Sequence, residues 1–342
     1  MMSVDLGSRT TKAVHLRRAN GKLVLCGYAI TDSLAAAKSV SAESLSDHLK
    51  SLTEKLRPKT KSLTLTVGAN DAVLRTAEAP LMSKEDFRAV LKHNSKVYLQ
   101  QELPGYVFDV HPLLYFGKAE SERGPQASVK KQKQRLLIAG AKGRLLDGYV
   151  EAAKGAGLIT EHVVPGLIGT INAFELAKPE HFLGSAVALV DIGFKTSSIC
   201  VLNRGDLALS RVVAIGGDRI TESLSEIMNI GYAEAEGIKI GMSGDVRREL
   251  ETVVGPLGRE LRASIDFFEH EHDRTVSHVF ICGGSARSDV VRQILESELM
   301  MECSNWDPVS ILAKELSPQQ DAELEHVGAQ FAVAVGAALG AM

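Results

Sequence analysis

Hydrophobic and polar positions along the chain predict the same succession of elements twice. The first succession is three strands, a helix and a fourth strand, at residues 4–6, 11–16, 23–30, 44–56 and 62–67. The second is again three strands followed by helical spacing, at residues 187–191, 197–202, 207–214 and 220–228. Because this order recurs within one chain, the pattern predicts two related α/β lobes that face a cleft.

A segment of different character separates the two successions. It predicts a helix at 83–98, strands at 106–116 and 136–141, and a second helix at 142–155. The polar run at 118–134 predicts an exposed loop. We interpret residues 80–157 as an inserted α+β subdomain. The two lobes then comprise residues 1–79, 158–185 and 327–342 for the first and 186–326 for the second.

Two further helices are predicted near the carboxyl end. The helix at 245–272 has one apolar stripe, formed by Val253, Leu257, Leu261, Ile265 and Phe268. The last helix, at 327–339, is small or apolar on nearly every side. A helix of that kind is expected to cross a core or the seam between two lobes.

Two of the predicted strands end in related turns. Residues 3–12 read SVDLGSRTTK, and residues 187–198 read VALVDIGFKTSS. In each, an apolar run leads into Asp-x-Gly and then into hydroxyl and basic side chains. The glycine permits a tight turn that presents N–H groups to phosphate oxygens, and the aspartate can hold Mg²⁺ through water. The pair therefore predicts a nucleotide clamped between two related halves.

A third turn supports the same interpretation. Residues 279–286 read VFICGGSA, a buried-strand run that breaks at paired glycines and is followed by helical spacing from Asp289. Backbone without side chains could pass here against a flat adenine face. A strand, a turn and a helix in this order are typical of nucleoside and phosphate sites.

The candidate nucleotide contacts lie in these turns and in the Gly-Gly-Asp that begins the helix after the second hairpin. They are Asp5, Gly7, Ser8, Arg9, Thr10, Thr11, Lys12, Asp191, Gly193, Phe194, Lys195, Thr196, Ser197, Gly216, Gly217, Asp218, Gly283, Gly284 and Ser285. Asp5 and Asp191 are the candidate metal ligands. Ordinary structure offers an alternative for each kind of residue. Turn carboxylates can cap their own hairpins, hydroxyls can bond turn backbone, hairpin-tip charges can be solvated, and Asp218 can be a helix N-cap.

Composition limits the class of protein and the compartment in which it is expected. The chain has 342 residues, of which 45% are hydrophobic and 24% charged, and its net charge is −3. These values suit two soluble domains and give no overall attraction to nucleic acid or anionic lipid. The cysteines Cys26, Cys200, Cys282 and Cys303 are widely spaced and predict free thiols in a reducing compartment. We find no leader segment and no apolar run of membrane-spanning length, and expect a cytoplasmic protein without direct membrane insertion.

The motifs resemble those of the superfamily of actin-like, sugar-kinase and heat-shock-chaperone ATPases. Residues 5–7 and 191–193 look like its two phosphate loops, 281–284 like its adenosine loop, and 335–340 like a helix connecting the lobes. The closer resemblance is to the PilM family of type IV pilus assembly, which is related to the division protein FtsA. It rests on EAPLMSKEDF at 78–87, SIDFF at 264–268 and FAVAVG at 331–336.

This resemblance implies an actin-like, ribonuclease H-like fold of two lobes with the inserted subdomain, and ATP or ADP bound with Mg²⁺ between the lobes. Glu236 and Lys239 match positions that contact the ribose in that superfamily, although a surface ion pair at this spacing is the alternative. The implied partner is the N-terminal peptide of a PilN-like inner-membrane protein, held in a groove beside the insertion. The resemblance thus implies a cytoplasmic adaptor that associates peripherally with the inner membrane, in the assembly platform of a type IV pilus or of a type II secretion-like system.

The resemblance favours slow or absent ATP hydrolysis. Related chains carry acidic residues near the segment at 162–170, where this chain has Val164 and Gly166, with Glu161 as the nearby carboxylate. Three alternatives stay open: an FtsA-like division ATPase that self-associates into filaments, a phosphotransferase of the sugar-kinase type, and a scaffold that binds no nucleotide.

Overall fold

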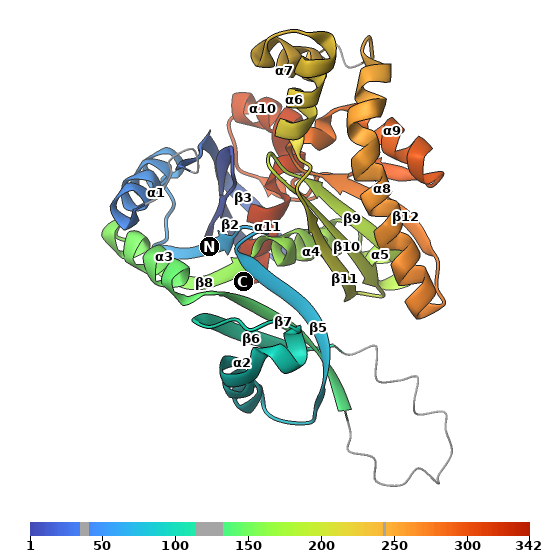
Figure 1. Cartoon of the computed structure of the whole chain (residues 1–342). Helices are drawn as coiled ribbons and strands as arrows, with labels where there is room; N and C mark the ends of the chain where they lie inside the picture. The colour runs from blue at the N-terminus through green and yellow to red at the C-terminus, as the bar shows by residue number, and fades with distance from the viewer. Residues whose placement is uncertain (35–40, 114–132, 242–243) are drawn as a thin grey trace.

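The computed structural model describes residues 1–34, 41–113, 133–241 and 244–342. Within them, three β-sheets and the helices packed on them form two large units and a smaller one beneath (Figure 1). The predicted exposed loop at 118–134 lies outside the described residues except for its last two, which begin a strand.

The first sheet has the strand order β14-β3-β2-β1-β4-β8. Its strands are β1 (Met2–Leu6), β2 (Thr10–Ala19), β3 (Lys22–Asp32), β4 (Ser62–Val67), β8 (Ile159–Pro165) and β14 (Ala313–Lys314). One face is covered by α1 (Ala42–Leu56) and α3 (Gly143–Gly155). Leu49 of α1 and Ala152 of α3 are buried there with Leu65 of β4, so both helices share the core of this sheet.

The second sheet has the order β11-β10-β9-β12-β13. Its strands are β9 (Ala186–Ile192), β10 (Ser197–Asn203), β11 (Asp206–Val213), β12 (Val276–Cys282) and β13 (Cys303–Asn305). The helices on it are α6 (Gly217–Met228), α7 (Tyr232–Gly241), α8 (Arg247–His272) and α9 (Asp289–Leu299). The predicted apolar stripe of α8 is buried in this core, which confirms the helical spacing at 245–272.

The two large sheets repeat one topology. In each, the first strand pairs antiparallel with the second and parallel with the fourth: β1 with β2 and β4, and β9 with β10 and β12. The hairpin registers also match, since Asp5 lies opposite Lys12 and Asp191 lies opposite Ser198. The predicted duplication is therefore confirmed, and it places the two Asp-x-Gly turns at equivalent sheet edges.

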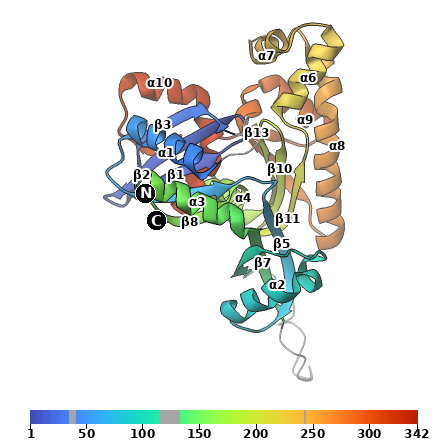
Figure 2. The same cartoon turned by 60° about the vertical axis from the view of Figure 1, so that its left-hand side comes forward.

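Helices α4 (Gly166–Ala177) and α11 (Ala332–Leu339) lie between the two sheets (Figure 1), and the turned view shows α4 between β8 and β11 (Figure 2). Phe174 and Val335 pack in one core with Leu16 of the first sheet and Leu189 of the second. The last helix thus crosses the seam, as its apolar surface predicts. Short elements flank it: α5 (Pro179–Gly184), α10 (Pro318–Val327), and the 3₁₀ turns η2 (Gly284–Arg287) and η3 (Gly328–Phe331).

The third sheet, β5-β7-β6, forms the smaller unit with α2 on it. Its elements are β5 (Ala72–Pro80), α2 (Lys84–Leu99), β6 (Tyr106–Pro112) and β7 (Lys133–Lys142). The predicted limits of 80–157 differ from this unit at both ends. The sheet already begins at Ala72, because β5 pairs with β7 along its whole length. At the other end α3 packs on α1 of the first sheet, where its buried alanines find an apolar partner.

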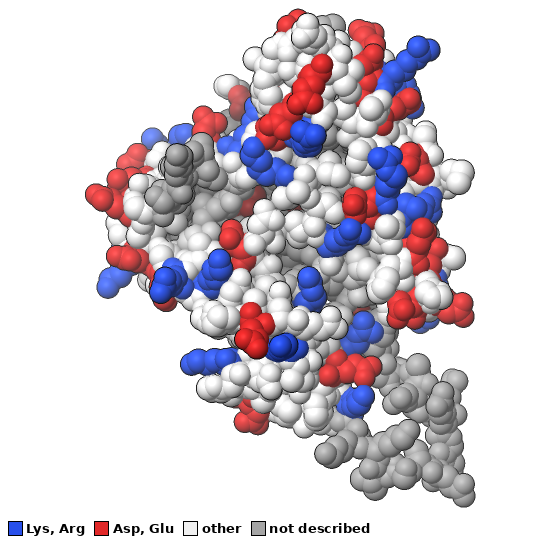
Figure 3. All heavy atoms as spheres, in the orientation of Figure 1, with Lys and Arg blue, Asp and Glu red and all other residues white. Residues whose placement is uncertain are grey.

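Charged side chains are mixed over the face in Figure 3, where basic and acidic groups are interspersed. In the described part of the chain, no helix combines the length and apolar character needed to cross a bilayer.

Candidate functional site

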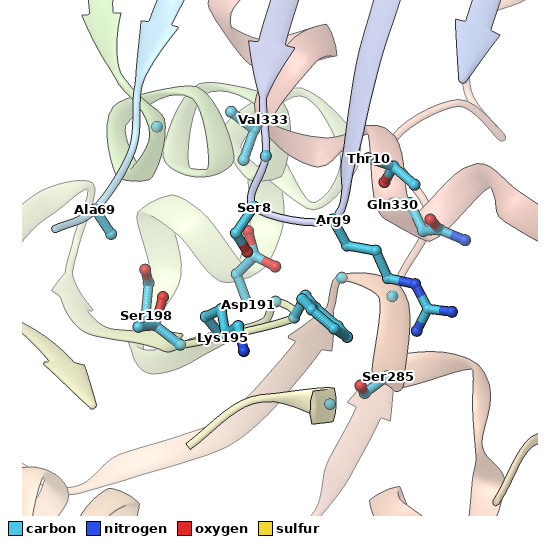
Figure 4. A pocket seen from close by; sticks show the side chains of 18 of the residues that line it. Ser8, Arg9, Thr10, Ala69, Asp191, Lys195, Ser198, Ser285, Gln330 and Val333 are labelled. Carbon is cyan, nitrogen blue, oxygen red and sulfur yellow. The ribbon is translucent and has the colours of Figure 1, made fainter. Parts of the chain in front are cut away.

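The two Asp-x-Gly hairpins face each other across one cavity of ≈ 510 Å³. Figure 4 shows Ser8 of the first hairpin directly over Asp191 of the second, while Arg9 extends from the first hairpin toward the side of the cavity where Ser285 lies. The sequence-predicted residues that line it are Asp5, Gly7, Ser8, Arg9, Thr10, Lys12, Asp191, Gly193, Phe194, Lys195, Thr196, Gly217, Glu236, Lys239, Gly283, Gly284 and Ser285. Residues far apart in sequence therefore meet at one place.

The glycines of both hairpins are required by the same close approach. A Cβ on Gly7 would lie 2.6 Å from the carbonyl oxygen of Thr10, and one on Gly193 would lie 2.8 Å from that of Thr196. Real Cβ atoms do not come so close to a carbonyl oxygen. The backbone N–H of Gly193 also donates to the Thr196 carbonyl at 3.1 Å. Both turns are thus equally tight, and bare backbone is presented to the cavity.

The first carboxylate, Asp5, is held by two groups. Its Oδ1 accepts a hydrogen bond from the Thr66 hydroxyl at 3.1 Å, and its Oδ2 lies 3.5 Å from the Lys12 ammonium. Lys12 also donates to the Thr10 carbonyl at 3.4 Å, so it spans its own turn. Both side chains are largely shielded from solvent and have fixed places at the cavity floor.

The second carboxylate, Asp191, is the more strongly perturbed. Burial raises its pKa to about 6, and the charge of Asp5 adds to the rise, while Lys12 and a hydrogen bond from Thr170 oppose it. Gly283 lies against it with φ +95°, and a Cβ there would be 2.4 Å from Asp191 Oδ1. The third glycine turn therefore leaves room for this carboxylate as well as for a ligand.

Asp5 is close enough to Asp191 for its charge to act on that carboxyl, and the two carboxylates together fit one kind of metal. No three His, Cys, Asp or Glu side chains converge within the described ranges. Mg²⁺ suits two carboxylates beside phosphate, because it keeps several waters and takes phosphate oxygens rather than a full protein cage. These residues could therefore hold Mg²⁺ with a nucleotide.

Arg9 and Lys195, which occupy matching positions in the two hairpins, are both engaged in ion pairs with acidic residues of the second lobe. Arg9 Nη1 lies 2.9 Å from Glu236 Oε1, and Lys195 pairs with Asp218. The Tyr232 hydroxyl donates to the other Asp218 oxygen at 2.7 Å. Hydrogen bonds from Lys195 and Tyr232 lower the pKa of Asp218 although its burial acts in the opposite direction.

Glu236 and Lys239 form a buried pair rather than a surface one. The Lys239 ammonium donates to Glu236 Oε2 at 2.7 Å, to the Thr221 hydroxyl at 2.7 Å and to the Gly217 carbonyl at 3.0 Å. Burial lowers the pKa of Lys239, and the Glu236 carboxylate partly offsets this. The alternative of a solvated pair on α7 is thereby wrong, and both side chains face the cavity.

Four predicted residues lie beside the cavity without lining it: Thr11, Ser197, Gly216 and Asp218. Thr11 is buried and hydrogen-bonds His48 at 2.8 Å, and Ser197 donates to the Ile215 carbonyl at 2.6 Å. A Cβ on Gly216 would lie 2.3 Å from the Phe194 carbonyl. These residues hold the turns in shape.

The cavity also has walls that sequence reasoning missed. They are Leu6, Gly68, Ala69, Asn70, Asp71, Gly166, Leu167, Ser198, Ile240, Ser288, Val291, Gln330 and Val333. The turn at 68–71 follows β4, which pairs parallel with β1, so its position beside Asp5 follows from the strand pairing. Glu161, the carboxylate proposed near the connecting segment, is instead exposed and bonded to Ser62 outside the cavity. Asp71 lines the cavity in its place.

Comparison with known proteins gives the fold. A chain from a PilM–PilN type IV pilus biogenesis complex superposes with a TM-score of 0.82 at 20% identity, covering 99% of this chain and 97% of that one. EutJ from Carboxydothermus hydrogenoformans gives 0.55 at 14% identity, covering 99% and 88%. MreB5 of Spiroplasma citri bound to ADP gives 0.52 at 10% identity, covering 99% and 94%. The fold is the actin-like one, as predicted.

Sequence comparison gives the family. Cell division protein FtsA of Bacillus subtilis (strain 168) is 30% identical over 174 residues, which is 50% of this chain and 38% of FtsA. The chain thus matches less than half the length of this curated relative. The family model of the type IV pilus assembly protein PilM matches residues 3–342. The chain therefore belongs to the PilM family of type IV pilus assembly proteins.

Proposed function

We propose that this protein is an ATP-binding adaptor of the inner-membrane platform that assembles type IV pili. Nucleotide binding is supported by one observation above all. Two equivalent Asp-x-Gly hairpins, from separate sheets, line one cavity of ≈ 510 Å³. A cavity of this size suits a mid-sized ligand. MreB5, which shares the fold, has been solved with ADP and with AMPPNP. Mg²⁺ bound by Asp5 and Asp191 would neutralise phosphate charge between the hairpins.

The partner we propose is a PilN-like inner-membrane protein. The similar solved chain comes from a PilM–PilN complex, and the family is one of pilus assembly. The N-terminal peptide of such a partner would bind beside the unit formed by β5, β6, β7 and α2. Association with the membrane would then be peripheral and would depend on the partner. Self-association, as in an FtsA-like filament, is the second kind of assembly to test.

Isothermal titration with ATP tests the nucleotide site directly. We expect one ATP per chain in the presence of Mg²⁺ and much weaker binding when EDTA removes the metal. Absence of heat under both conditions would favour a scaffold that binds no nucleotide. Consumption of ATP only when a sugar is added would favour a phosphotransferase.

Fluorescence anisotropy with a labelled peptide tests the partner. The peptide is the cytoplasmic N-terminus of a PilN-like protein, and a scrambled peptide of the same composition is the control. We expect saturable binding of the peptide with the native sequence and no saturable binding of the scrambled peptide. Equal binding of both peptides would contradict the adaptor function while leaving nucleotide binding intact.

ATP turnover is expected to be slow and to depend on Asp71. This carboxylate lines the cavity, and none of the other described residues bonds its side chain, so it is available to position water. Asp71→Asn should lower single-turnover phosphate release at least about tenfold at unchanged ATP affinity. Glu161→Gln, outside the cavity, is the matched control and should release phosphate at the original rate. If Glu161→Gln released phosphate more slowly than Asp71→Asn, Glu161 and not Asp71 would be the water-positioning group.

A further inference from the structure

Arg9 belongs to the first hairpin, but its side chain contacts the second lobe. Its guanidinium Nη1 lies 2.9 Å from Glu236 Oε1 on α7. Its Cζ lies 5.0 Å from the centre of the Phe194 ring in the second hairpin. An ion pair and a cation–π contact thus join one arginine to two separate elements across the cavity. Figure 4 shows this side chain reaching out from the hairpin into the cavity.

The carboxylate that Arg9 contacts has both oxygens engaged. Glu236 Oε1 faces Arg9, while Oε2 accepts from Thr221 and from Lys239. Lys239 is in turn fixed by the Gly217 carbonyl, so the pair cannot rotate freely toward a ligand. A ligand hydroxyl that approaches Glu236 from the cavity therefore competes with Arg9 for Oε1.

The exposed fractions of the Arg9 and Glu236 side chains indicate which partner of the ion pair is free to move. The Arg9 side chain is 48% exposed, whereas that of Glu236 is 16% exposed. The carboxylate is anchored within its own lobe, and the arginine covers it from the other lobe. Release of the contact therefore means movement of the Arg9 side chain.

We propose that Arg9 is a ligand-displaceable latch, which joins the two lobes over the cavity through Glu236 and Phe194 and competes with the nucleoside part of the ligand for Glu236. The proposal rests on nucleotide binding in this cavity. This role differs from that of a simple phosphate-binding residue. An Arg9 latch opposes binding of a nucleoside, whereas an Arg9 that only binds phosphate has no effect on nucleoside binding. Once the nucleoside has displaced it from Glu236, Arg9 remains on the first Asp-x-Gly hairpin, which faces the proposed phosphate site.

Titration with adenosine, which has no phosphate, separates these roles. Arg9→Ala should bind adenosine about threefold to tenfold more tightly than the unaltered protein, since half-exposed ion pairs and cation–π contacts are modest. Arg17→Ala is the matched control. Arg17 lies on the next strand of the same sheet, is 43% exposed, and pairs with Glu315 beside β14 of that sheet, away from the cavity. It should leave adenosine affinity unchanged.

Small-angle X-ray scattering tests the latch without any ligand. Arg9→Ala should have a larger radius of gyration than Arg17→Ala at about 0.05 M NaCl, and the difference should shrink at about 0.5 M, where salt screens the ion pair. Circular dichroism confirms that both variants are folded. Unchanged or weaker adenosine binding by Arg9→Ala would overturn the latch, and so would equal radii of gyration. If no form of the protein binds ATP or adenosine, the proposed function fails, and the scattering result still decides whether Arg9 joins the lobes.

Discussion

Asparagine in place of Asp191 is expected to abolish magnesium-dependent ATP binding and, at the same time, to stabilise the nucleotide-free protein. Both effects follow from the position of this carboxylate at the end of β9, against Gly283 and near Asp5. Mg²⁺ in protein sites is held mainly by carboxylates and phosphate oxygens, and asparagine removes the negative charge of one of the two carboxylates. We expect the affinity for ATP in Mg²⁺ to fall at least about 100-fold, as measured by isothermal titration.

The gain in stability has a defined pH dependence. The pKa of Asp191 is raised from 3.8 to about 6 by burial and by the charge of Asp5. A raised pKa contributes stability that is fully present below about pH 4 and is lost as the pH rises through about 6. Above that range the folded protein contains a charged carboxylate that is partly withdrawn from solvent and lies near the charge of Asp5. Asparagine is neutral at every pH and should raise the free energy of unfolding by about 1–3 kcal/mol at pH 7.5.

Urea unfolding at two pH values checks the sign. The difference between Asp191→Asn and the unaltered protein should be largest at pH 7.5 and close to zero at pH 4. Asp47→Asn on α1, whose side chain is 68% exposed, makes the same chemical change on the surface and should alter neither stability nor ATP binding. A variant at position 191 that still binds ATP through Mg²⁺ would remove this aspartate from the metal site.

The hairpins could be predicted from sequence because their evidence is local. An apolar run, Asp-x-Gly and the following polar cluster are contiguous, and the glycines that the turns require are visible as letters. The walls at 68–71, Gln330 and Val333 could not be found in this way. They reach the cavity only because β4 pairs with β1 and the C-terminal segment folds between the sheets. For the turn at 68–71, the parallel pairing of β4 with β1 is the feature from which its place beside Asp5 could have been inferred.

Tertiary packing also decided the cases in which local reasoning fell short. The spacing of α3 predicts a helix correctly, but its assignment to the insertion depends on the partner of Ala152 and Ala153, which is α1. Arg9 looks equally like a phosphate contact and like a solvated hairpin tip in the sequence. Its partner Glu236 lies 227 residues further on, which no local pattern reveals.

Alanine in place of Gly336 is expected to lower the free energy of unfolding by about 3 kcal/mol, although alanine favours helices. The reason is the contact of α11 with α4 at the seam between the sheets. A Cβ on Gly336 would lie 1.7 Å from the Gly169 carbonyl oxygen and 2.7 Å from the Ala173 amide nitrogen. These are backbone atoms and cannot rotate away, so the helices must separate. Urea unfolding followed by circular dichroism measures the loss.

Gly148→Ala on α3 is the matched control for this effect. It makes the same substitution within a helix, but a Cβ there meets nothing within 4 Å. Helix propensity then acts alone and should raise stability by up to about 1 kcal/mol. Because Val333 of α11 and Leu167 of α4 line the cavity, separation of the two helices should also weaken ATP binding. Equal stability of the two alanine variants would show that the seam can open without cost and that the glycines do not fix how the two lobes meet.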